Sequence, residues 1–560
     1  MPPKNFLVSL YLLFRLFVKH SRSFFGIDCI EKQGTEERRM TRLQRFFING
    51  LVLAVASVVM RTVAVAFNAY VSASVGAEGM GLFTLVMSVY GFSATFALSG
   101  VSLASMRLCA EAVGKEDDGL LRAYLLRALG YAAVFGIAAT LLLFFFAEPI
   151  GTGILGDGRT VSSLRLLALS LLPTSLSAVM MGYFNAVRRA TKNAAMQVFE
   201  QAVRIILTIL GLFLLLPKGI EYACVALVIG ISASQILSFL FAFVAYLFDR
   251  RKHKLPEKKA KTNGRGLLSR LCRISLPIAV STYVRSGLTT LEHILIPRCL
   301  SQSGASREEA LSSYGVLHGM SLPVLLYPAG ILASFTGLLV PETAESLARG
   351  ETRRITYLVE RILSFALFFS LLSAGLVYLL ADELGTLVYR NGEVGVYVAA
   401  LVPLLPVMYL DTTVDNILKG IGEQFYCMCV NVADALLSVV LVLVFLPRFG
   451  ALGYVAVLLI AEIFNFTLSI IRLYRRVPFR VPLFRDIFLP TGLSVLSVAL
   501  TSLLFSGVAT SFLSTLLKGG VYLVLATLLF LFTGVIGGER REWLSKIFKG
   551  ESAKENGNLS

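Results

Sequence analysis

ISLPIAVSTYVRSGLTTLEHILIPR, residues 274–298, is an apolar run that carries charges, and it decides the fold. It is long enough to cross a bilayer, since about 20 apolar residues span the hydrocarbon core. Its interior nevertheless holds Arg285, Glu292 and His293. An ionised side chain at that depth costs about 3 kcal/mol on insertion scales, so such residues usually face a polar cavity. An Arg–Glu pair that only joins two helices is the alternative interpretation.

An earlier run repeats this pattern. Residues 51–71 read LVLAVASVVMRTVAVAFNAYV, in which Asn68 follows Arg61 by seven positions. In the later run Glu292 follows Arg285 by the same seven. The interval from the first arginine to the second therefore equals the interval from Asn68 to Glu292, and we predict two related halves in the same order.

Other segments continue the repeat. MSVYG at 87–91 and LSSYG at 311–315 are separated by that same interval. Further along the chain, Asn185 corresponds to Asn416 and Gly219 to Gly450. These two intervals are equal to each other and slightly longer than those of the earlier segments. A few residues are thus inserted between the two sets, and parallel membrane repeats of this kind place a substrate site between the halves.

Composition identifies a polytopic membrane protein. Hydrophobic residues make up 56% of the chain and charged residues 16%, with a mean hydropathy of +0.75. The net charge of +17 does not indicate a nucleic-acid partner, because the basic residues lie in short segments between apolar runs. The sequence contains no Gly-rich phosphate loop, no Ser/His/Asp set with readable roles and no Cys/His metal spacing. We expect neither an enzyme nor a resident metal or cofactor, and we interpret the seven cysteines as packing residues.

Apolar runs long enough to cross the membrane recur along the chain. They lie near 46–71, 82–107, 123–146, 164–185, 195–216, 222–248, 274–297, 312–340, 355–380, 395–418, 427–446, 451–471, 487–507 and 517–537. The predicted fold is all-α, with about fourteen transmembrane helices in two parallel-repeat lobes around a central cavity. Pro403 and Pro406 predict a kink in the tenth run.

The loop charges predict the orientation. With the segment at 38–45 set inside, the inner loops and the tail hold most of the Lys and Arg residues, and the loops on the other side hold few. The positive-inside rule then places both termini in the cytoplasm of a bacterial cell, with the chain in its cytoplasmic membrane.

These runs also predict the organisation of the chain. An extension, interfacial or dispensable, comes first, and a basic cytoplasmic linker joins the halves. The predicted parts are the extension at 1–39, the first lobe at 40–248, the linker at 249–273, the second lobe at 274–475, two further spans within 476–537 and a cytoplasmic tail at 538–560.

The two equivalent arginines predict the kind of substrate. Guanidinium groups bind phosphate bidentately and stay charged. Arg61 and Arg285 facing one cavity would suit a diphosphate. Glu200 and Arg204, spaced i, i+4, are interpreted as an ion pair on a helix surface.

Other polar residues in the runs are candidates for shaping the cavity or for coupling to an ion. The carboxylates could bind a cation or neutralise the arginines, and a histidine could relay protons or be packed and neutral. These residues are Asn68, Glu292, His293, Asp411 and Asp415.

Four stretches resemble a known family. They are GAEGMGLFTLVMSVYG at 76–91, YVRSGLTTLEHILIPR at 283–298, ASFTGLLVPE at 333–342 and NILKGIGEQFYCMCVNVADALLSVVLVLVFLPRFGALGY at 416–454. They are similar to the stage V sporulation protein B group of oligosaccharide flippases. This group belongs to the multidrug/oligosaccharidyl-lipid/polysaccharide exporter superfamily, together with lipid II flippases and multidrug and toxin extrusion proteins.

The resemblance implies fourteen helices, two lobes and a central cavity that opens to one side at a time. It also implies that lipid-linked sugars cross the membrane without ATP hydrolysis. Cavity arginines are needed in lipid II flippases, and Arg61 and Arg285 resemble them in role.

The leading hypothesis is a flippase for an undecaprenyl-diphosphate-linked saccharide, a lipid II-like precursor of peptidoglycan. Its partners would be the lipid-linked saccharide, membrane lipids and enzymes of cell-wall synthesis, with Na⁺ or H⁺ as candidate coupling ions. One alternative is a cation-coupled multidrug exporter that uses Glu292 as its cation site. The other is a scaffold for wall synthesis that transports nothing.

Overall fold

A computed structural model describes residues 42–115, 117–187, 189–252, 265–336, 349–480 and 484–533, with residues 343, 346, 347 and 482. The predicted extension at 1–39, the centre of the linker and the tail lie outside the described residues. The chain divides into two compact units, one of residues 1–59 and 536–560, the other Met60–Val535. The second unit carries every candidate site residue.

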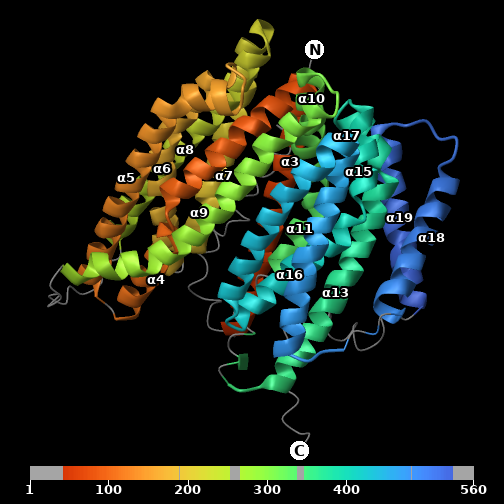
Figure 1. The fold of residues 1–560 in the computed structure, drawn as a ribbon. Coiled ribbons are helices and arrows are strands. Elements are labelled where there is room, and N and C mark those ends of the chain that lie inside the picture. Colours follow the sequence, from red (N-terminus) through yellow and green to blue (C-terminus); the bar gives the residue numbers. More distant parts are fainter. Residues whose placement is uncertain are drawn as a thin grey trace, which may run out of the picture. The chain divides into compact units, whose positions relative to one another are not determined.

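The first half consists of long helices joined by short turns (Figure 1). In chain order these elements are α3 (Arg42–Leu98), α4 (Val101–Gly114), α5 (Asp118–Glu148), the π-helix η1 (Pro149–Ile154), α6 (Thr160–Ala186), α7 (Ala190–Leu215), the short 3₁₀ turn η2 (Leu216–Lys218) and α8 (Ile220–Lys252).

The second half is more interrupted. Its elements are α9 (Arg265–Gln302), α10 (Arg307–Tyr314), the π-helix η3 (Gly315–Ser321), α11 (Leu322–Thr336), α13 (Thr352–Leu379), α14 (Ala381–Glu383), the π-helix η4 (Leu384–Val388), α15 (Gly392–Leu401), α16 (Leu404–Gly420), α17 (Gln424–Arg476), the π-helix η5 (Phe484–Phe488), α18 (Leu489–Leu504) and α19 (Phe512–Phe532).

The fold is an all-helical membrane fold, as predicted. Among the described residues, ten helices are long and apolar enough to cross a membrane, or eleven if the bent pair α15–α16 counts as one span. The bend of that pair is 56° and lies at Pro403, which confirms the predicted kink. Two of the ten helices each contain two predicted runs, because α3 has a non-helical residue at Gly76 and α17 has one at Gly450. The eighth predicted run, 312–340, covers α10, η3 and α11 and extends beyond the described residues.

The helices of each half pack on one another through buried apolar faces. In the first half α6 packs against α4, α5 and α8, and α7 packs against α8. In the second half α17 packs against α9 and α16, and α13 against α16, while α18 and α19 lie side by side and also contact α13. Large apolar side chains such as Phe145 and Phe213 are 71% and 78% exposed, as expected of surfaces that face lipid.

The two halves repeat one backbone turn in detail. In the first half the N–H groups of Leu155 and Asp157 each donate to a carbonyl of η1, at 2.7 and 2.8 Å. In the second half the N–H groups of Tyr389 and Asn391 each donate to a carbonyl of η4, at 3.1 and 2.9 Å. The side chains of Asp157 and Asn391 then accept equivalent backbone bonds, at 3.0 and 2.9 Å. This shared turn supports the predicted internal repeat.

The predicted glycine pair supports it too. Gly219 has φ 124° and ψ 172°, and Gly450 has φ 57° and ψ −143°. Only glycine adopts these combinations of φ and ψ easily. Both residues lie where the chain changes direction between two apolar runs. The equivalence inferred from the sequence interval therefore coincides with an equivalent break in the backbone.

Candidate functional site

Arg61 lies at the junction of the two halves. It is exposed on α3, and its side chain lies over Gly330 of α11, where a Cβ atom would overlap the guanidinium. The hydroxyl of the neighbouring Thr62 is 2.8 Å from the hydroxyl of Tyr327, which belongs to α11 like Gly330. Gly330 thus provides the space in which the cation of Arg61 rests.

Arg61 also lines an open cleft in the first half. The cleft has a volume of about 310 Å³, and its walls come from α3 and α7. The lining residues are Met60, Arg61, Ala64, Gln197, Glu200 and Gln201.

The interpretation of Glu200 and Arg204 as a surface pair needs correction. The ion pair is present, with Arg204 Nη2 2.5 Å from Glu200 Oε1, but the side chains are only 29% and 24% exposed. Gln235 of α8 donates to the same oxygen at 2.8 Å. The carboxylate is therefore a fixed wall of the cleft.

Arg285 does not line this cleft. It is exposed on α9 and has no hydrogen bond or ion pair with any residue that the structure describes. Its charge acts on the carboxylates of the second half, namely Asp411, Asp434 and Glu462. A cavity shared by Arg61 and Arg285 stays a prediction.

Asn68 follows Arg61 on α3 by about two helical turns. Its Oδ1 atom is buried and has no hydrogen-bond partner among the described residues. A buried amide oxygen without a partner costs free energy that a ligand or water can recover. Asn68 keeps its place as a candidate that shapes the cavity.

Glu292 and His293 belong to a polar chain inside the second half. The Tyr454 hydroxyl donates to Glu292 Oε1 at 3.3 Å and lies 2.7 Å from His318 Nε2. The rings of His318 and His293 are 4.7 Å apart, and His293 Nδ1 is 2.9 Å from the Tyr314 hydroxyl. This chain joins α9, α10, η3 and α17, and its groups are of the kinds that pass protons.

Asp411 and Asp415 are buried on α16, each beside an asparagine of α17. Asn465 donates to Asp411 at 3.2 Å and Asn431 to Asp415 at 3.4 Å. The Oδ1 atoms of both aspartates are buried without a hydrogen-bond partner in the described chain. Lys419 Nζ lies 3.3 Å from Asp415 Oδ2, so the negative charge of Asp415 is partly neutralised.

Two further carboxylates, which were not predicted as site residues, lie near these aspartates. Asp434 and Glu462 interact with the charge of Asp411 and also lie in predicted apolar runs. The criterion that found Arg61, a charge inside an apolar run, applies equally to them. Within the described residues, no group of three or more His, Cys, Asp or Glu side chains is placed to hold a metal ion.

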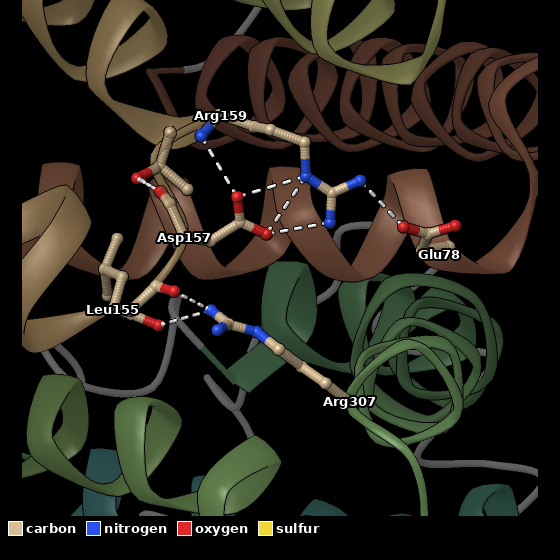
Figure 2. A network of polar contacts seen from close by, with 7 residues as sticks. Glu78, Leu155, Asp157, Arg159 and Arg307 are labelled. Carbon is tan, nitrogen blue, oxygen red and sulfur yellow. Dashed lines mark hydrogen bonds and ion pairs between the residues drawn. The ribbon is translucent and has the colours of Figure 1, made fainter.

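A second set of polar contacts connects the halves at one end of the helices (Figure 2). In the first half Arg159 lies between two carboxylates, 2.8 Å from Glu78 Oε1 and 2.8 Å from Asp157 Oδ2. From the second half Arg307 reaches the carbonyl of Leu155 at 3.3 Å and also that of Gly156. Figure 2 shows the two arginines on opposite sides of the 155–159 loop.

Arg298 adds to this connection. At the end of α9 it donates to the carbonyls of Gly153, at 3.1 Å, and Ile154. Two cations of the second half thus bind backbone carbonyls of η1 and the loop that follows it. We call these contacts of Arg298 and Arg307 the latch.

Comparisons with known proteins agree on one family. The family described as polysaccharide biosynthesis protein matches residues 47–347, more than half of the 560 residues. The stage V sporulation protein B of Bacillus subtilis is 26% identical over 73% of this chain and 80% of its own length. The lipid II flippase MurJ of the same organism is 23% identical over the same shares.

Solved structures show the same fold. A lipid II flippase MurJ in an inward closed conformation has a TM-score of 0.66, with 16% identity over 86% of this chain and 99% of that one. An inward-facing multidrug resistance transporter of the MATE family has a TM-score of 0.57, with 14% identity over 75% of this chain and 98% of that one.

Proposed function

Since this chain belongs to the polysaccharide biosynthesis protein family, within the multidrug/oligosaccharidyl-lipid/polysaccharide exporters, we propose that it is a flippase for an undecaprenyl-diphosphate-linked saccharide. Its cargo is a lipid II-like precursor of peptidoglycan, which it moves across the bacterial cytoplasmic membrane by alternating access. Both termini lie in the cytoplasm.

The observation that carries the proposal is the position of Arg61. Its guanidinium lines an open cleft and rests on a helix of the other half. Placing such a cation in a membrane costs about 3 kcal/mol, so we expect it to bind an anion there. The planar fork of guanidinium fits a phosphate, which it binds through two parallel hydrogen bonds.

The diphosphate binds Arg61 and, in the course of the cycle, Arg285, which has no bound carboxylate among the described residues. Asn68 and Glu292 shape the polar side of the path, and the lipid tail stays in the bilayer. The halves then rock about the site, as parallel-repeat transporters do.

We propose that an ion drives the cycle through the second half. The Glu292–Tyr454–His318 contacts offer a route for H⁺. The buried Oδ1 atoms of Asp411 and Asp415, which no described residue hydrogen-bonds, offer ligands for Na⁺. Transport measured with either gradient imposed alone distinguishes the two ions.

A cation-coupled multidrug exporter is the second candidate. The buried aspartates of α16 and the likeness to MATE structures favour it. An exporter of cationic drugs needs a cavity carboxylate and does not need Arg61 or Arg285.

The test is transport of fluorescent lipid II in vesicles that contain only this protein. Arg61→Ala and Arg285→Ala should each reduce the rate about tenfold or more, because a charge-assisted hydrogen bond is worth about 1.5–3 kcal/mol. Dye efflux that survives both substitutions, with no lipid II transport by the unaltered protein, would establish the exporter. If the unaltered protein transports neither substrate, the scaffold for wall synthesis gains support.

Arg285→Lys tests the geometry of the phosphate site. Lysine keeps the charge but not the planar fork. We expect transport to stay well below that of the unaltered protein, and full activity would contradict bidentate binding at this position.

A further inference from the structure

The wall of the cleft opposite Arg61 carries two glutamines whose side chains no described residue hydrogen-bonds. Gln197, Glu200 and Gln201 are spaced i, i+3 and i+4 on α7, so they share one face of the helix. Neither glutamine has a side-chain hydrogen bond to any residue that the structure describes. Amides in a membrane-crossing helix cost free energy unless they are paired, so this face suits a polar ligand.

The charges of the cleft define the ligand further. Arg61 and Glu200 line the same space without forming an ion pair. Glu200 is instead bound by Arg204, which largely compensates its charge, while Arg61 has no such partner in the described chain. Among the described residues, the cleft therefore has a cation without an ion-pair partner at α3 and a nearly neutral set of donors and acceptors at α7.

We propose that the α7 face binds the first sugar of the substrate, directly next to the phosphate on Arg61. This proposal rests on the proposed function. A sugar phosphate has an anionic group at one end and neutral hydroxyl and acetamido groups at the other, which matches the order of groups across the cleft. Amide and carboxylate side chains hydrogen-bond to such groups in pairs. The volume of about 310 Å³ lies within the range of small-molecule sites and suits one sugar ring.

The same arrangement disfavours a cationic drug at this face. Glu200 already has the Arg204 guanidinium at 2.5 Å, so a second cation there would face a compensated carboxylate and the repulsion of Arg61. The residues of α7 are thus specificity determinants for a saccharide.

The test compares two lipids in nanodiscs that hold the full-length protein. One is lipid II, and the other is undecaprenyl diphosphate without a sugar. Gln197→Leu and Gln201→Leu should each weaken lipid II binding roughly threefold to tenfold, the effect of one lost hydrogen bond. Binding of the sugar-free lipid should not change, which also shows that the variants are folded. Gln424→Leu, an exposed glutamine outside the cleft, is the matched control and should change neither affinity.

The outcomes separate the two proposals. If Arg61→Ala weakens both lipids but the glutamine variants keep their full preference for lipid II, the sugar site is wrong and the flippase proposal stands. If Arg61→Ala changes neither lipid, the phosphate site itself fails. Equal weakening of both lipids by Gln201→Leu would also overturn a role in reading the sugar.

Discussion

The position of the Arg61 side chain depends on Gly330, a residue in the other half of the sequence. Its guanidinium occupies the space that a side chain at Gly330 would fill. The two residues come from α3 and α11, so the position of the cation depends on how the halves pack.

Gly330→Ala should therefore impair transport, but less than Arg61→Ala does, because the displaced guanidinium keeps its charge. The added methyl group overlaps the guanidinium and displaces it from the cleft, while alanine is a better helix former than glycine and should not weaken α11. Initial rates of lipid II transport in vesicles measure the effect. Gly130→Ala is the matched control, since a Cβ there meets nothing within 4 Å. Normal transport by the Gly330 variant would show that the resting place of Arg61 does not matter.

At the scale of residues, the sequence reveals the charged residues of the site but not the residues that they contact. Arg61, Arg285 and Glu292 stand out because an ionised group inside an apolar run is costly. Gln197 and Gln201 do not stand out, since a neutral amide costs less and is common in helices. Gly330 could not be found at all, because its role exists only once α11 meets α3.

Among the structural elements, the repeated turn contains a strained residue. Arg390 has φ of 55°, and its equivalent in the first half is Gly156, with φ of 68°. The left-handed conformation costs a residue with a side chain about 1–2 kcal/mol, whereas glycine adopts it freely.

Arg390→Gly should stabilise the protein by about 0.5–1 kcal/mol, because part of the relief is offset by the greater freedom of glycine in the unfolded chain. Thermal unfolding in detergent measures it as a higher midpoint. Gly156→Ala should lower the midpoint for the converse reason. A lower midpoint for the Arg390 variant would mean that its side chain makes contacts that outweigh the strain.

The first copy of the turn adds an ion pair to the shared backbone. Burial by itself would raise the pKa of the Asp157 carboxyl, but hydrogen bonds from Arg159 outweigh it and hold that pKa below the ordinary 3.8. A carboxyl with a lowered pKa contributes stability above its unfolded pKa and loses it as pH falls through the folded value.

The coupling between Asp157 and Arg159 should therefore be the same at pH 5.5 and pH 8, and should weaken only below about pH 3.8. A double-mutant cycle with Asp157→Ala and Arg159→Ala, followed by chemical unfolding at each pH, measures it. A coupling that disappears between pH 8 and pH 5.5 would show that another titrating group controls the loop.

For the whole molecule, the latch determines how firmly the halves are joined at one end. Arg298 and Arg307 donate to four carbonyls of residues 153–156. Both arginines are exposed, so each contributes modestly to the closed arrangement. In the proposed cycle the latch breaks when this end opens, since its two sides belong to different halves.

Arg307→Ala should raise the population of the open arrangement about fivefold, the effect of losing about 1 kcal/mol. Spin labels at Thr152 and Gln302, in a background without native cysteines, report this as a longer distance in pulsed electron resonance. Arg448→Ala, another exposed arginine with no ion pair in the described residues, is the control. An unchanged distance distribution in the Arg307 variant would remove the latch from the conformational cycle.

At this scale the sequence was informative about the fold. Apolar runs predict the helices, and recurring sequence intervals predict the repeat. The interval matches Gly219 with Gly450, and the structure shows that both are breaks in the backbone. The latch could not be predicted, since Arg298 and Arg307 bind backbone carbonyls, which leave no signature in the sequence. The π-helices were likewise invisible, because they arise from a shift in hydrogen bonding that packing decides.

The repeated turn finally bears on surface charge. Two residues beyond Asp157 the chain has Arg159, and two residues beyond Asn391 it has Glu393. The main chain is nearly the same in both places, yet the first copy carries Asp157 and Arg159 where the second carries Asn391 and Glu393. Copies of a parallel repeat lie at the same side of the membrane, so one backbone presents different charges to the same aqueous phase. The electrostatic surface of this rim can therefore be redesigned by exchanging a few side chains on an unchanged fold.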